Sequence, residues 1–239
     1  MSQTKSLDLE PYLNGDTNNV LIIGDLHLPF ELEEYILFVR YQQEKYNCGT
    51  IIFIGDIVDS HNSSFHVSDP DGLSAKSELD LAILKLKEWY RLFPEATITL
   101  GNHDRIAMRK AFDGGLSTKW MKGYAEVLEV PNWNFVDEIE INGVLYIHGE
   151  GQTAISEVSK KFSSVVQGHR HTDCYTQYLQ NSRGTFFGMQ VGCGISKDKY
   201  AFKYAKNNLD PVISCGIVLN SGTVGFVVPF SKDIWKIQS

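Results

Sequence analysis

Three expected strands in the first half of the chain each end in glycine followed by a polar residue. They are residues 20–23 before Gly24-Asp25, residues 50–54 before Gly55-Asp56, and residues 96–100 before Gly101-Asn102. Continuous apolar runs are typical of strands that are buried on both faces. Helical periodicity lies between them, so the pattern predicts parallel strands joined by crossover helices. The polar residues at the three strand ends should then converge on one edge of the sheet.

The second half of the chain predicts a different, β-rich pattern. Asn142-Gly143 is a strong signal for a two-residue hairpin turn, which would join strands at residues 133–141 and 144–147. The other expected strands are residues 164–167, 175–180, 185–191, 212–219 and 223–228, and the expected helices are residues 31–46, 75–92, 119–129 and 154–162. The roughly 65 residues after His171 are expected to complete a second sheet. We therefore expect one domain over residues 1–239, with residues 1–18 as a loosely packed N-terminal segment.

The composition narrows the classes of function. A formal net charge of −7 gives no broad electrostatic footprint for duplex nucleic acid, although bound metal ions would reverse the sign within an acidic cleft. The N-terminal residues contain no apolar core of a signal peptide, and no stretch is apolar enough to cross a bilayer. The four cysteines form no CxxC pair and suit buried, reduced thiols. We expect a cytoplasmic protein that has no membrane partner.

Five of the seven histidines lie at the ends of expected strands, beside Gly, Asp or Asn. They are His27, His103, His148, His169 and His171. Carboxylate and imidazole ligands together suit Mn, Fe, Zn, Co or Ni better than Mg. Asp25 and His27 are two residues apart on an extended segment, so they point to one side and can reach one ion, and His169 and His171 share this spacing. Two ions can lie close together only if a carboxylate bridges them, and Asp56 is the natural candidate.

Five short segments carry a further signal through their order along the chain. They are Gly24-Asp25-Leu26-His27, Gly55-Asp56-Ile57-Val58-Asp59, Gly101-Asn102-His103-Asp104, His148-Gly149 and Gly168-His169-Arg170-His171. In this order they resemble the calcineurin-like metallophosphoesterase family, whose pattern is DxH, GDxxD, GNH(D/E), H and GHxH. The resemblance is specific because five motifs agree in order and spacing, whereas a lone GNHD would be weak. It implies an α/β fold, a four-layer α/β/β/α sandwich of two packed mixed sheets flanked by helices.

The resemblance also implies two divalent metal ions per chain. One would be bound by Asp25, His27, Asp56 and His171, and the other by Asp56, Asn102, His148 and His169. Mn²⁺ is the expected metal, with Fe, Zn, Ni and Co as alternatives. Such a pair would activate a water molecule and neutralise the phosphoryl oxygens for in-line attack on a phosphate ester.

The third segment supplies the expected catalytic residues. In the family, the histidine of the GNH segment stabilises the transition state or protonates the leaving oxygen, which gives that role to His103. Asp104 is expected to orient the His103 ring, since a carboxylate that is hydrogen-bonded to one imidazole nitrogen fixes the tautomer. Asp59 is not counted as a ligand: it would either support the Asp56 loop or stabilise a turn.

Three further residues are candidates for substrate binding. Arg105 and Arg170 lie next to the motifs and could receive phosphate oxygens, although surface charge is the usual role of such side chains. His61 follows the second motif in a polar loop, where a solvated position is the alternative to a substrate contact.

The subgroup of the family decides which phosphate ester is expected. Protein Ser/Thr phosphatases of the family carry Arg-Gly after the second motif, whereas Ser60-His61 stands there in this chain. The first and third motifs are nearer to the DNA-repair nuclease branch, but the chain after His171 leaves no room for that branch's capping domain. The leading hypothesis is a phosphodiesterase acting on a nucleotide, cyclic nucleotide or short nucleic-acid end. The alternatives are a phosphomonoesterase for proteins or small metabolites, and a catalytically silent metal-binding scaffold. The sequence specifies no oligomeric state.

Overall fold

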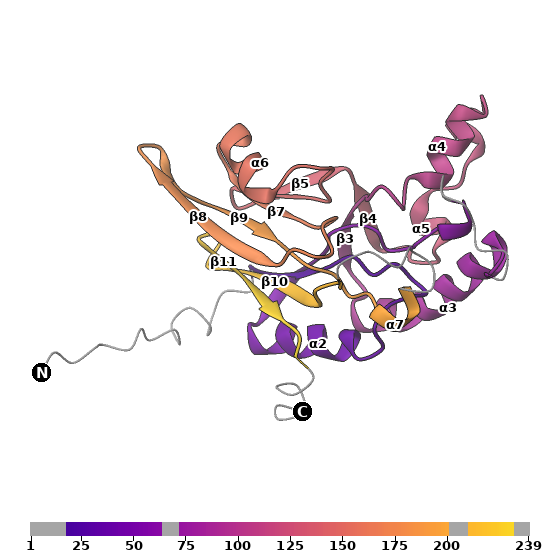
Figure 1. Ribbon diagram of the computed structural model, residues 1–239, viewed down its shortest axis with the longest axis horizontal. Coiled ribbons are helices and arrows are strands. Elements are labelled where there is room, and N and C mark those ends of the chain that lie inside the picture. The colour runs from indigo at the N-terminus through magenta and orange to yellow at the C-terminus, as the bar shows by residue number, and fades with distance from the viewer. Residues whose placement is uncertain (1–17, 64–71, 201–209, 232–239) are drawn as a thin grey trace, which may run out of the picture.

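The computed structural model describes residues 18–63, 72–200 and 210–231 (Figure 1). The N-terminal segment expected to be loosely packed lies, apart from Asn18, outside these ranges. The strands are β1 (Asn19–Ile23), β2 (Cys48–Phe53), β3 (Ala96–Thr99), β4 (Trp133–Val136), β5 (Glu138–Ile141), β6 (Val144–Ile147), β7 (Ser164–Gln167), β8 (Tyr175–Asn181), β9 (Gly184–Gln190), β10 (Ser214–Leu219) and β11 (Val224–Pro229). The helices are α2 (Tyr35–Lys45), α3 (Ala75–Leu92), α4 (Ile106–Asp113), α5 (Tyr124–Val127), α6 (Ala154–Lys161) and α7 (Lys197–Tyr200), with short 3-10 turns η1 (His61–Ser63) and η2 (Thr118–Trp120).

The first sheet has six strands in the order β11-β10-β1-β2-β3-β4. β1, β2 and β3 run parallel, as predicted, with Ile22 opposite Ile52. β4 adds a fourth parallel strand that was not predicted, with Ile98 opposite Phe135. All residues of β1 are buried, which is typical of a parallel strand covered on both faces. The carboxyl ends of these strands therefore meet at one edge of the sheet.

The second sheet has five strands in the order β5-β6-β7-β9-β8. The predicted hairpin turn at Asn142-Gly143 is confirmed: both residues have positive φ angles, of 51° and 72°, and Ile141 pairs with Val144. The single strand expected at residues 133–141 is wrong, because the chain leaves the first sheet after β4 and enters the second with β5.

The last two described strands return to the first sheet. β10 pairs antiparallel with β1, placing Val218 opposite Val20, and β11 pairs with β10. The prediction that the chain after His171 completes the second sheet is therefore only partly right, since β8 and β9 do so and β10 and β11 do not. The first sheet therefore contains strands from both halves of the sequence.

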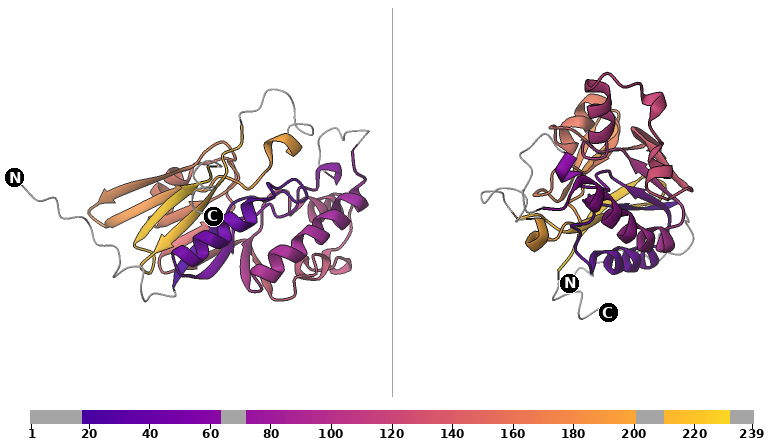
Figure 2. Two further views of the ribbon diagram at one scale, coloured as in Figure 1. Left: turned by 90° about the horizontal axis from the view of Figure 1, so that it is seen from below. Right: turned by 90° about the vertical axis from the view of Figure 1, so that its right-hand side faces the viewer.

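Three apolar clusters divide the fold into four layers (Figures 1 and 2). α2 and α3 pack on the outer face of the six-stranded sheet, with Tyr35 and Trp89 in the cluster beneath them. A second cluster, which includes Ile22 and Tyr146, lies between the two sheets. A third joins α6 to the five-stranded sheet through Val158. The predicted α/β/β/α sandwich of two mixed sheets is confirmed.

The helices differ from the sequence predictions at several places, among them the short α7, which was not predicted. α3 has the predicted bounds, but the helix expected at residues 119–129 is wrong: η2 and α5 stand there, and Gly123 between them has extended backbone, with φ −68° and ψ 155°. α4 was not predicted. It stands out from the body of the molecule beside α5 (Figure 1), and only Ile106 and Ala111 of its residues are buried.

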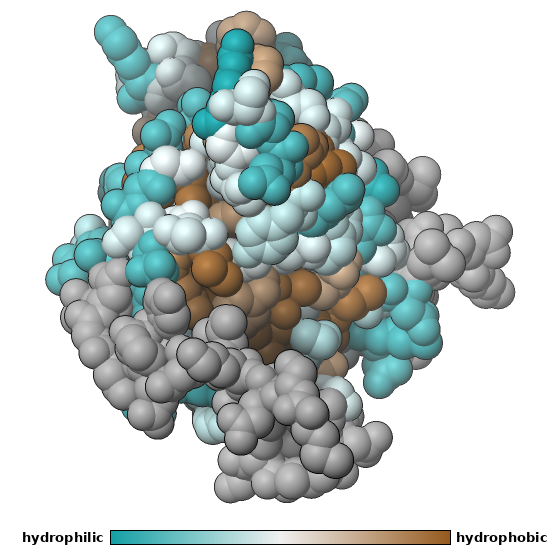
Figure 3. All heavy atoms as spheres, turned by 90° about the vertical axis from the view of Figure 1, so that its left-hand side faces the viewer, coloured by the Kyte–Doolittle hydropathy of each residue, from teal (hydrophilic) through white to brown (hydrophobic). Residues whose placement is uncertain are grey.

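Two surface features complete the description. Figure 3 shows the face that lies on the left in Figure 1, where hydrophobic residues reach the surface in a band between hydrophilic ones. Among the helices of the described ranges, none is long and apolar enough to cross a membrane.

Candidate metal centre

The predicted ligands lie on loops that follow five strands of the two sheets. β1, β2 and β3 are followed by Asp25, Asp56 and Asn102, and β6 and β7 are followed by His148 and His169. Because the strands within each set are parallel, each sheet presents its loops at one edge. The structure brings these loops together, so that their ligand atoms form two groups that share Asp56.

The first group consists of Asp25, His27, Asp56 and His171, whose ligand atoms lie within 4.8 Å of one another. Nε2 of His27 is 3.2 Å from Nε2 of His171 and 3.5 Å from Oδ2 of Asp56. Nε2 of His171 is 3.1 Å from Oδ2 of Asp25. These are the four residues that the resemblance implied for one metal ion, and the structure places them together.

The second group consists of Asp56, His148 and His169, with the amide of Asn102 between the two rings. Oδ1 of Asn102 is 3.1 Å from Nε2 of His148 and 2.9 Å from Nδ1 of His169. Nε2 of His148 is 3.2 Å from Oδ2 of Asp56. The same carboxylate oxygen therefore faces a ring nitrogen of each group, which is the position required of a bridging ligand.

The donor set fits a pair of divalent cations. Oδ1 of Asp25 is buried and, within the ranges that the structure describes, has no hydrogen-bond partner. An orphaned carboxylate oxygen in a protein interior is costly unless a positive charge compensates it. Imidazole, carboxylate and amide oxygen ligands at these spacings suit borderline metals such as Mn, Fe and Zn. The two groups together form the candidate metal centre.

Three of the predicted ligands have left-handed backbone. The φ angles of His27, Asp56 and His169 are 48°, 47° and 68°. Each such residue costs roughly 1–3 kcal/mol and persists only where its surroundings fix it. The loops that follow β1 and β2 are bound to each other: the carbonyl oxygen of Asp56 accepts hydrogen bonds from the backbone N–H groups of Leu26 and His27, at 3.1 and 2.9 Å. The fold thus maintains a costly conformation where the ligands converge.

Tyr35 connects the first loop to the far end of the chain. Its buried hydroxyl accepts a hydrogen bond from the N–H of Gly24 at 3.0 Å and donates one to the carbonyl oxygen of Ser214 at 2.6 Å. α2 and β10 therefore both hold the segment that carries Asp25.

The glycines beside the ligands let backbone approach the carboxylates closely. A Cβ atom at Gly101 would lie 2.0 Å from Oδ1 of Asp56, and one at Gly168 would lie 2.3 Å from Oδ1 of Asp25. Neither distance is sterically possible, so these positions exclude any side chain while the ligands keep their places. The recurrence of glycine in the motifs follows from this packing.

We expect Gly101→Ala to displace the Asp56 carboxylate and to lower Mn²⁺ affinity by about tenfold to a hundredfold, the range seen when residues that orient metal ligands are changed. Gly123→Ala is the matched control, because a Cβ there meets nothing within 4 Å. Isothermal titration calorimetry with Mn²⁺ measures both variants. Unchanged affinity in Gly101→Ala would contradict the predicted crowding.

The charges within the centre set the protonation of the histidines. Burial favours neutral rings, but hydrogen bonds and charges of Asp56 and Asp59 outweigh it and raise the pKa of His27 to about 10. Burial is likewise outweighed at His148, where the charges of Asp56 and Asp25 raise the pKa to about 10. Burial opposes the ionised form of Asp56 too, but the His148 and His27 rings hold its pKa well below the usual range. Without metal, both rings are therefore protonated at neutral pH.

Metal binding should therefore release about two protons per chain near neutral pH, because only neutral imidazole binds a cation. Each of these rings has its pKa raised to about 10, so affinity should rise with pH between about pH 6 and pH 9. Calorimetric titration with Mn²⁺ in two buffers of different ionisation enthalpy measures the release. Equal binding enthalpies in the two buffers would show that the rings are already neutral.

Asp59 holds His27 and His103, a role that the sequence left open. Its Oδ1 is 2.6 Å from Nδ1 of His27, and both side chains are fully buried. Its carbonyl oxygen accepts a hydrogen bond from Nδ1 of His103 at 2.5 Å. A carboxylate on the far nitrogen of a ligand histidine fixes its tautomer and orientation, so Asp59 is a positioning residue for the centre.

The prediction that Asp104 orients the His103 ring is wrong. The Asp104 carboxylate accepts hydrogen bonds from the backbone N–H groups of Asp56, Ile57 and Gly101, at 2.8, 3.0 and 2.9 Å. It therefore connects the loop after β2 to the loop after β3. The His103 ring is oriented instead by its hydrogen bond to the carbonyl of Asp59. Burial and the neighbouring Asp56 charge raise the pKa of Asp104 to about 6.

Of the three residues predicted to bind substrate, the two arginines are paired with acidic side chains and His61 is buried. Arg105 pairs with Asp137 at 2.9 Å and with Glu150 at 3.3 Å, and Arg170 pairs with Asp173. His61 is 3% exposed and begins η1, so the solvated position given as the alternative is wrong. A buried ring is not presented to an incoming substrate, and the structure does not support His61 as a binding residue.

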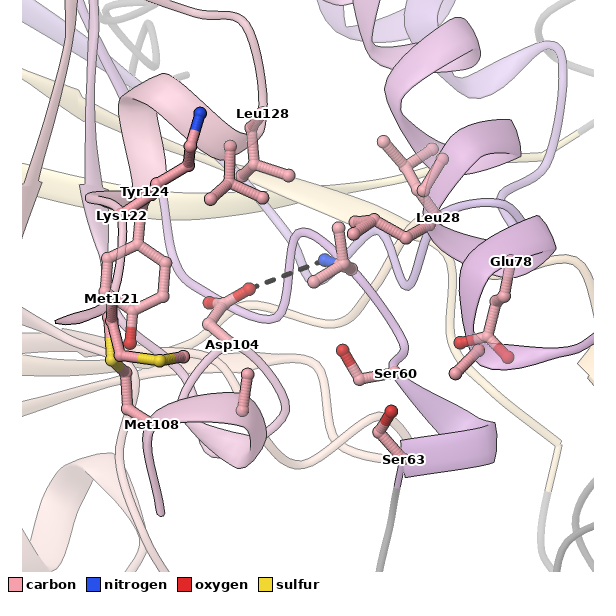
Figure 4. Close-up of a pocket in the computed structure, with 16 residues that line it drawn as sticks. Leu28, Ser60, Ser63, Glu78, Asp104, Met108, Met121, Lys122, Tyr124 and Leu128 are labelled. Carbon is pink, nitrogen blue, oxygen red and sulfur yellow. Dashed lines mark hydrogen bonds between the residues drawn. The ribbon is translucent and has the colours of Figure 1, made fainter. Parts of the chain in front are cut away.

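A mainly apolar cavity of about 170 Å³ lies behind the loops that follow β2 and β3 (Figure 4). Met108, Met121, Tyr124 and Leu128 line one side of it, and Asp104 reaches it from the loop after β3. The seven predicted ligands are all absent from its lining residues. The cavity and the candidate metal centre are thus separate, and Asp104 lies between them.

Several solved structures are similar to this chain at low identity. A metallophosphoesterase from Sphaerobacter thermophilus has 16% identity and a TM-score of 0.47, covering 92% of this chain and 91% of its own. An archaeal phosphodiesterase has 16% identity and a TM-score of 0.46, covering 89% and 99%. Vacuolar protein sorting 29 from Cryptosporidium parvum has 13% identity and a TM-score of 0.45, covering 90% and 98%.

The family assignment comes from the sequence profile of the chain. No curated protein matches it. The model of the calcineurin-like phosphoesterase family matches residues 19–210, a range that includes both groups of ligand atoms. The chain therefore belongs to the calcineurin-like phosphoesterase family.

Proposed function

We propose that the chain is a cytoplasmic phosphodiesterase that uses two divalent metal ions, with Mn²⁺ as the expected metal, to hydrolyse a nucleotide or nucleic-acid substrate. The observation that carries the proposal is the position of Asp56, whose Oδ2 faces His27 at 3.5 Å and His148 at 3.2 Å. A carboxylate shared in this way is what a pair of closely spaced cations requires. Membership of a phosphoesterase family supports the same class of reaction.

The charges around the centre favour a diester over a monoester. A phosphate monoester carries a charge of about −1.5 to −2 at neutral pH, whereas a diester carries only one negative charge. Arg105 and Arg170, the arginines next to the motifs, are already paired with acidic side chains. A terminal phosphate would have to displace those partners, so the less charged diester fits this surface better.

The chain's own residues would hold the ions and the substrate in place. Asp25, His27 and His171 would complete one site with Asp56, and Asn102, His148 and His169 the other. When bound, such ions supply the activation of a water nucleophile and the neutralisation of phosphoryl charge. The left-handed backbone and the close-packed glycines keep these ligands at fixed positions, so little reorganisation is needed when substrate binds.

His103 is placed to exchange a proton with the leaving oxygen. Because Nδ1 donates to the carbonyl of Asp59, it is Nε2 that gains and loses the second proton, and only the protonated ring can pass that proton to the leaving oxygen. Burial and the neighbouring His27 charge lower the pKa of His103, which makes the protonated ring a stronger acid. The ring also packs edge-on against that of His27, with centroids 4.5 Å apart, which keeps it beside the first group of ligands.

The test compares two chromogenic esters. With Mn²⁺, we expect faster hydrolysis of bis-p-nitrophenyl phosphate than of p-nitrophenyl phosphate, with loss of both activities in EDTA and recovery when Mn²⁺ is added back. Faster turnover of the monoester would overturn the diester preference and favour a phosphatase. Two bound metal ions without any turnover would favour the silent scaffold instead.

A further inference from the structure

Residues 106–122, here called the arm, leave the body of the protein directly after the third metal loop. The arm begins with α4, which stands out from the molecule in Figure 1. Residues 112–120 form an unbroken run of exposed positions that ends with η2. α4 buries Ile106 and Ala111 against the body, and Met108 and Met121 are partly buried beside the apolar cavity, whereas the other residues of the arm are exposed.

The exposed positions of the arm carry large apolar side chains. Phe112 is 75% exposed, Leu116 is 56% exposed and Trp120 is 84% exposed. Single exposed hydrophobics are ordinary, but three at four-residue intervals on one arm indicate a surface that binds something. Two of the three are aromatic, and flat rings in the open offer faces on which other rings can stack.

The charge of the arm identifies the class of partner. It contains four cationic residues and one acidic one, although the whole chain has a net charge of −7. The cations are Arg109, Lys110, Lys119 and Lys122, and the acid is Asp113. Aromatic rings interleaved with Lys and Arg are the usual composition of surfaces for single-stranded nucleic acid, because bases stack and phosphates pair with the cations.

A hollow at the root of the arm adds a place for a base. It has a volume of about 380 Å³ and is lined by Arg105, Arg109, Phe112 and Tyr124, among others. The Tyr124 ring is fixed by stacking on Phe135, with centroids 5.5 Å apart. The rings of Phe112 and Tyr124 beside Arg109 suit a stacked base next to a phosphate. Asp113 and Asp137 also line the hollow, and Asp137 pairs with Arg105, so no phosphate contact is assigned to Arg105.

Other partners fit the arm less well. An amphipathic helix that lies in a membrane surface needs a continuous apolar face free for the lipid, but α4 has only eight residues and turns Ile106 and Ala111 inward. A second copy of the chain has a net charge of −7, which would suit the cations of the arm. That copy would also need an apolar surface that matches the exposed apolar residues of the arm. The cations beside the rings favour a polyanion with flat rings of its own.

We propose that the arm binds a single-stranded nucleic acid and guides it to the candidate metal centre, with bases stacked on Trp120 and in the hollow beside Phe112. This proposal rests on the proposed phosphodiesterase function, since it names the substrate class of the same centre. α4 follows Asn102 and His103 by a few residues, and its eight residues extend about 12 Å, so a bound strand would lie within a few nucleotides of the ligands.

The test measures binding apart from cleavage. The probe is a fluorescein-labelled oligothymidylate of about twelve nucleotides, and its fluorescence anisotropy is followed in EDTA so that no hydrolysis occurs. We expect Trp120→Ala and Phe112→Ala each to weaken binding by about tenfold. Phe162→Ala is the matched control, because this ring is 53% exposed but belongs to the end of α6. Lys119→Gln should lower the slope of log affinity against log salt by about 1.

Three outcomes would overturn the proposal. Trp120→Ala and Phe112→Ala could bind the oligonucleotide as tightly as wild type. Trp120-dependent binding to vesicles of phosphatidylserine and phosphatidylcholine, without oligonucleotide binding, would assign the arm to a membrane surface. Self-association that is lost in Trp120→Ala, measured by sedimentation, would assign it to a second copy. Hydrolysis of bis-p-nitrophenyl phosphate by wild type is measured alongside, so failure of the arm and failure of the phosphodiesterase proposal are distinguished.

Discussion

Asp56→Asn should lower Mn²⁺-dependent hydrolysis of bis-p-nitrophenyl phosphate by more than about a thousandfold. The substitution keeps the shape of the side chain, and an amide oxygen can still accept the hydrogen bond that Oδ1 of Asp56 receives from the N–H of His103 at 2.8 Å. What it removes is the negative charge between His27 and His148. We therefore expect a folded protein that holds fewer metal ions, measured by elemental analysis together with kcat/KM.

The control for this variant is Asp80→Asn. Asp80 is 58% exposed on α3, where it pairs with Lys76, and a surface pair of this kind contributes little. A second readout follows from the electrostatics, because the charge of Asp56 raises the pKa values of His27 and His148. Without metal, both rings should titrate at lower pH in Asp56→Asn, as followed by NMR. Full activity in Asp56→Asn would show that Asp56 is not a metal ligand.

His103→Ala should affect a poor leaving group far more than a good one. Protonation of the leaving oxygen contributes about 10²–10⁴-fold when that oxygen is strongly basic, as in a dinucleotide. The nitrophenolate leaving group needs little help, so bis-p-nitrophenyl phosphate should lose much less rate. The measurement is kcat on thymidylyl-thymidine and on bis-p-nitrophenyl phosphate, with added imidazole as a rescue of the missing ring.

Metal content separates this role from a role as ligand. His103 is not one of the seven predicted ligands, so His103→Ala should retain the metal content of wild type. Equal losses of rate on both substrates would show that the ring positions substrate or supports His27 rather than donating a proton. Loss of metal in this variant would place the ring within the coordination shell.

The sequence predicted the ligands better than it predicted their supports. Asp25, Asp56 and His148 follow buried strands, and the ends of parallel strands meet in any fold of this class, so convergence follows from the local pattern. The direction in which Asp104 turns does not follow from spacing. Its carboxylate accepts hydrogen bonds from four backbone N–H groups of two loops, and that arrangement exists only once β2 and β3 are paired.

The missed elements are short or depend on a single residue. α4 has only eight residues and buries only Ile106 and Ala111, so its apolar pattern spans little more than two turns. The helix expected at residues 119–129 contains Gly123, whose extended backbone begins α5 anew. The alternation of the strand expected at residues 133–141 breaks at Val136 and Asp137, which is where the chain changes sheets.

The pairing of β1 with β10 has a consequence for synthesis of the protein. Val20 lies opposite Val218, and the hydroxyl of Tyr35 connects Gly24 to Ser214. A nascent chain on the ribosome therefore cannot complete the support of its first metal loop until β10 has emerged. Contacts of such long sequence separation slow folding, because the loop between the partners must be closed first. During translation, one edge of β1 stays unpaired until β10 has been synthesised. A chaperone would be of most use in this interval, because unpaired apolar strands are prone to aggregate.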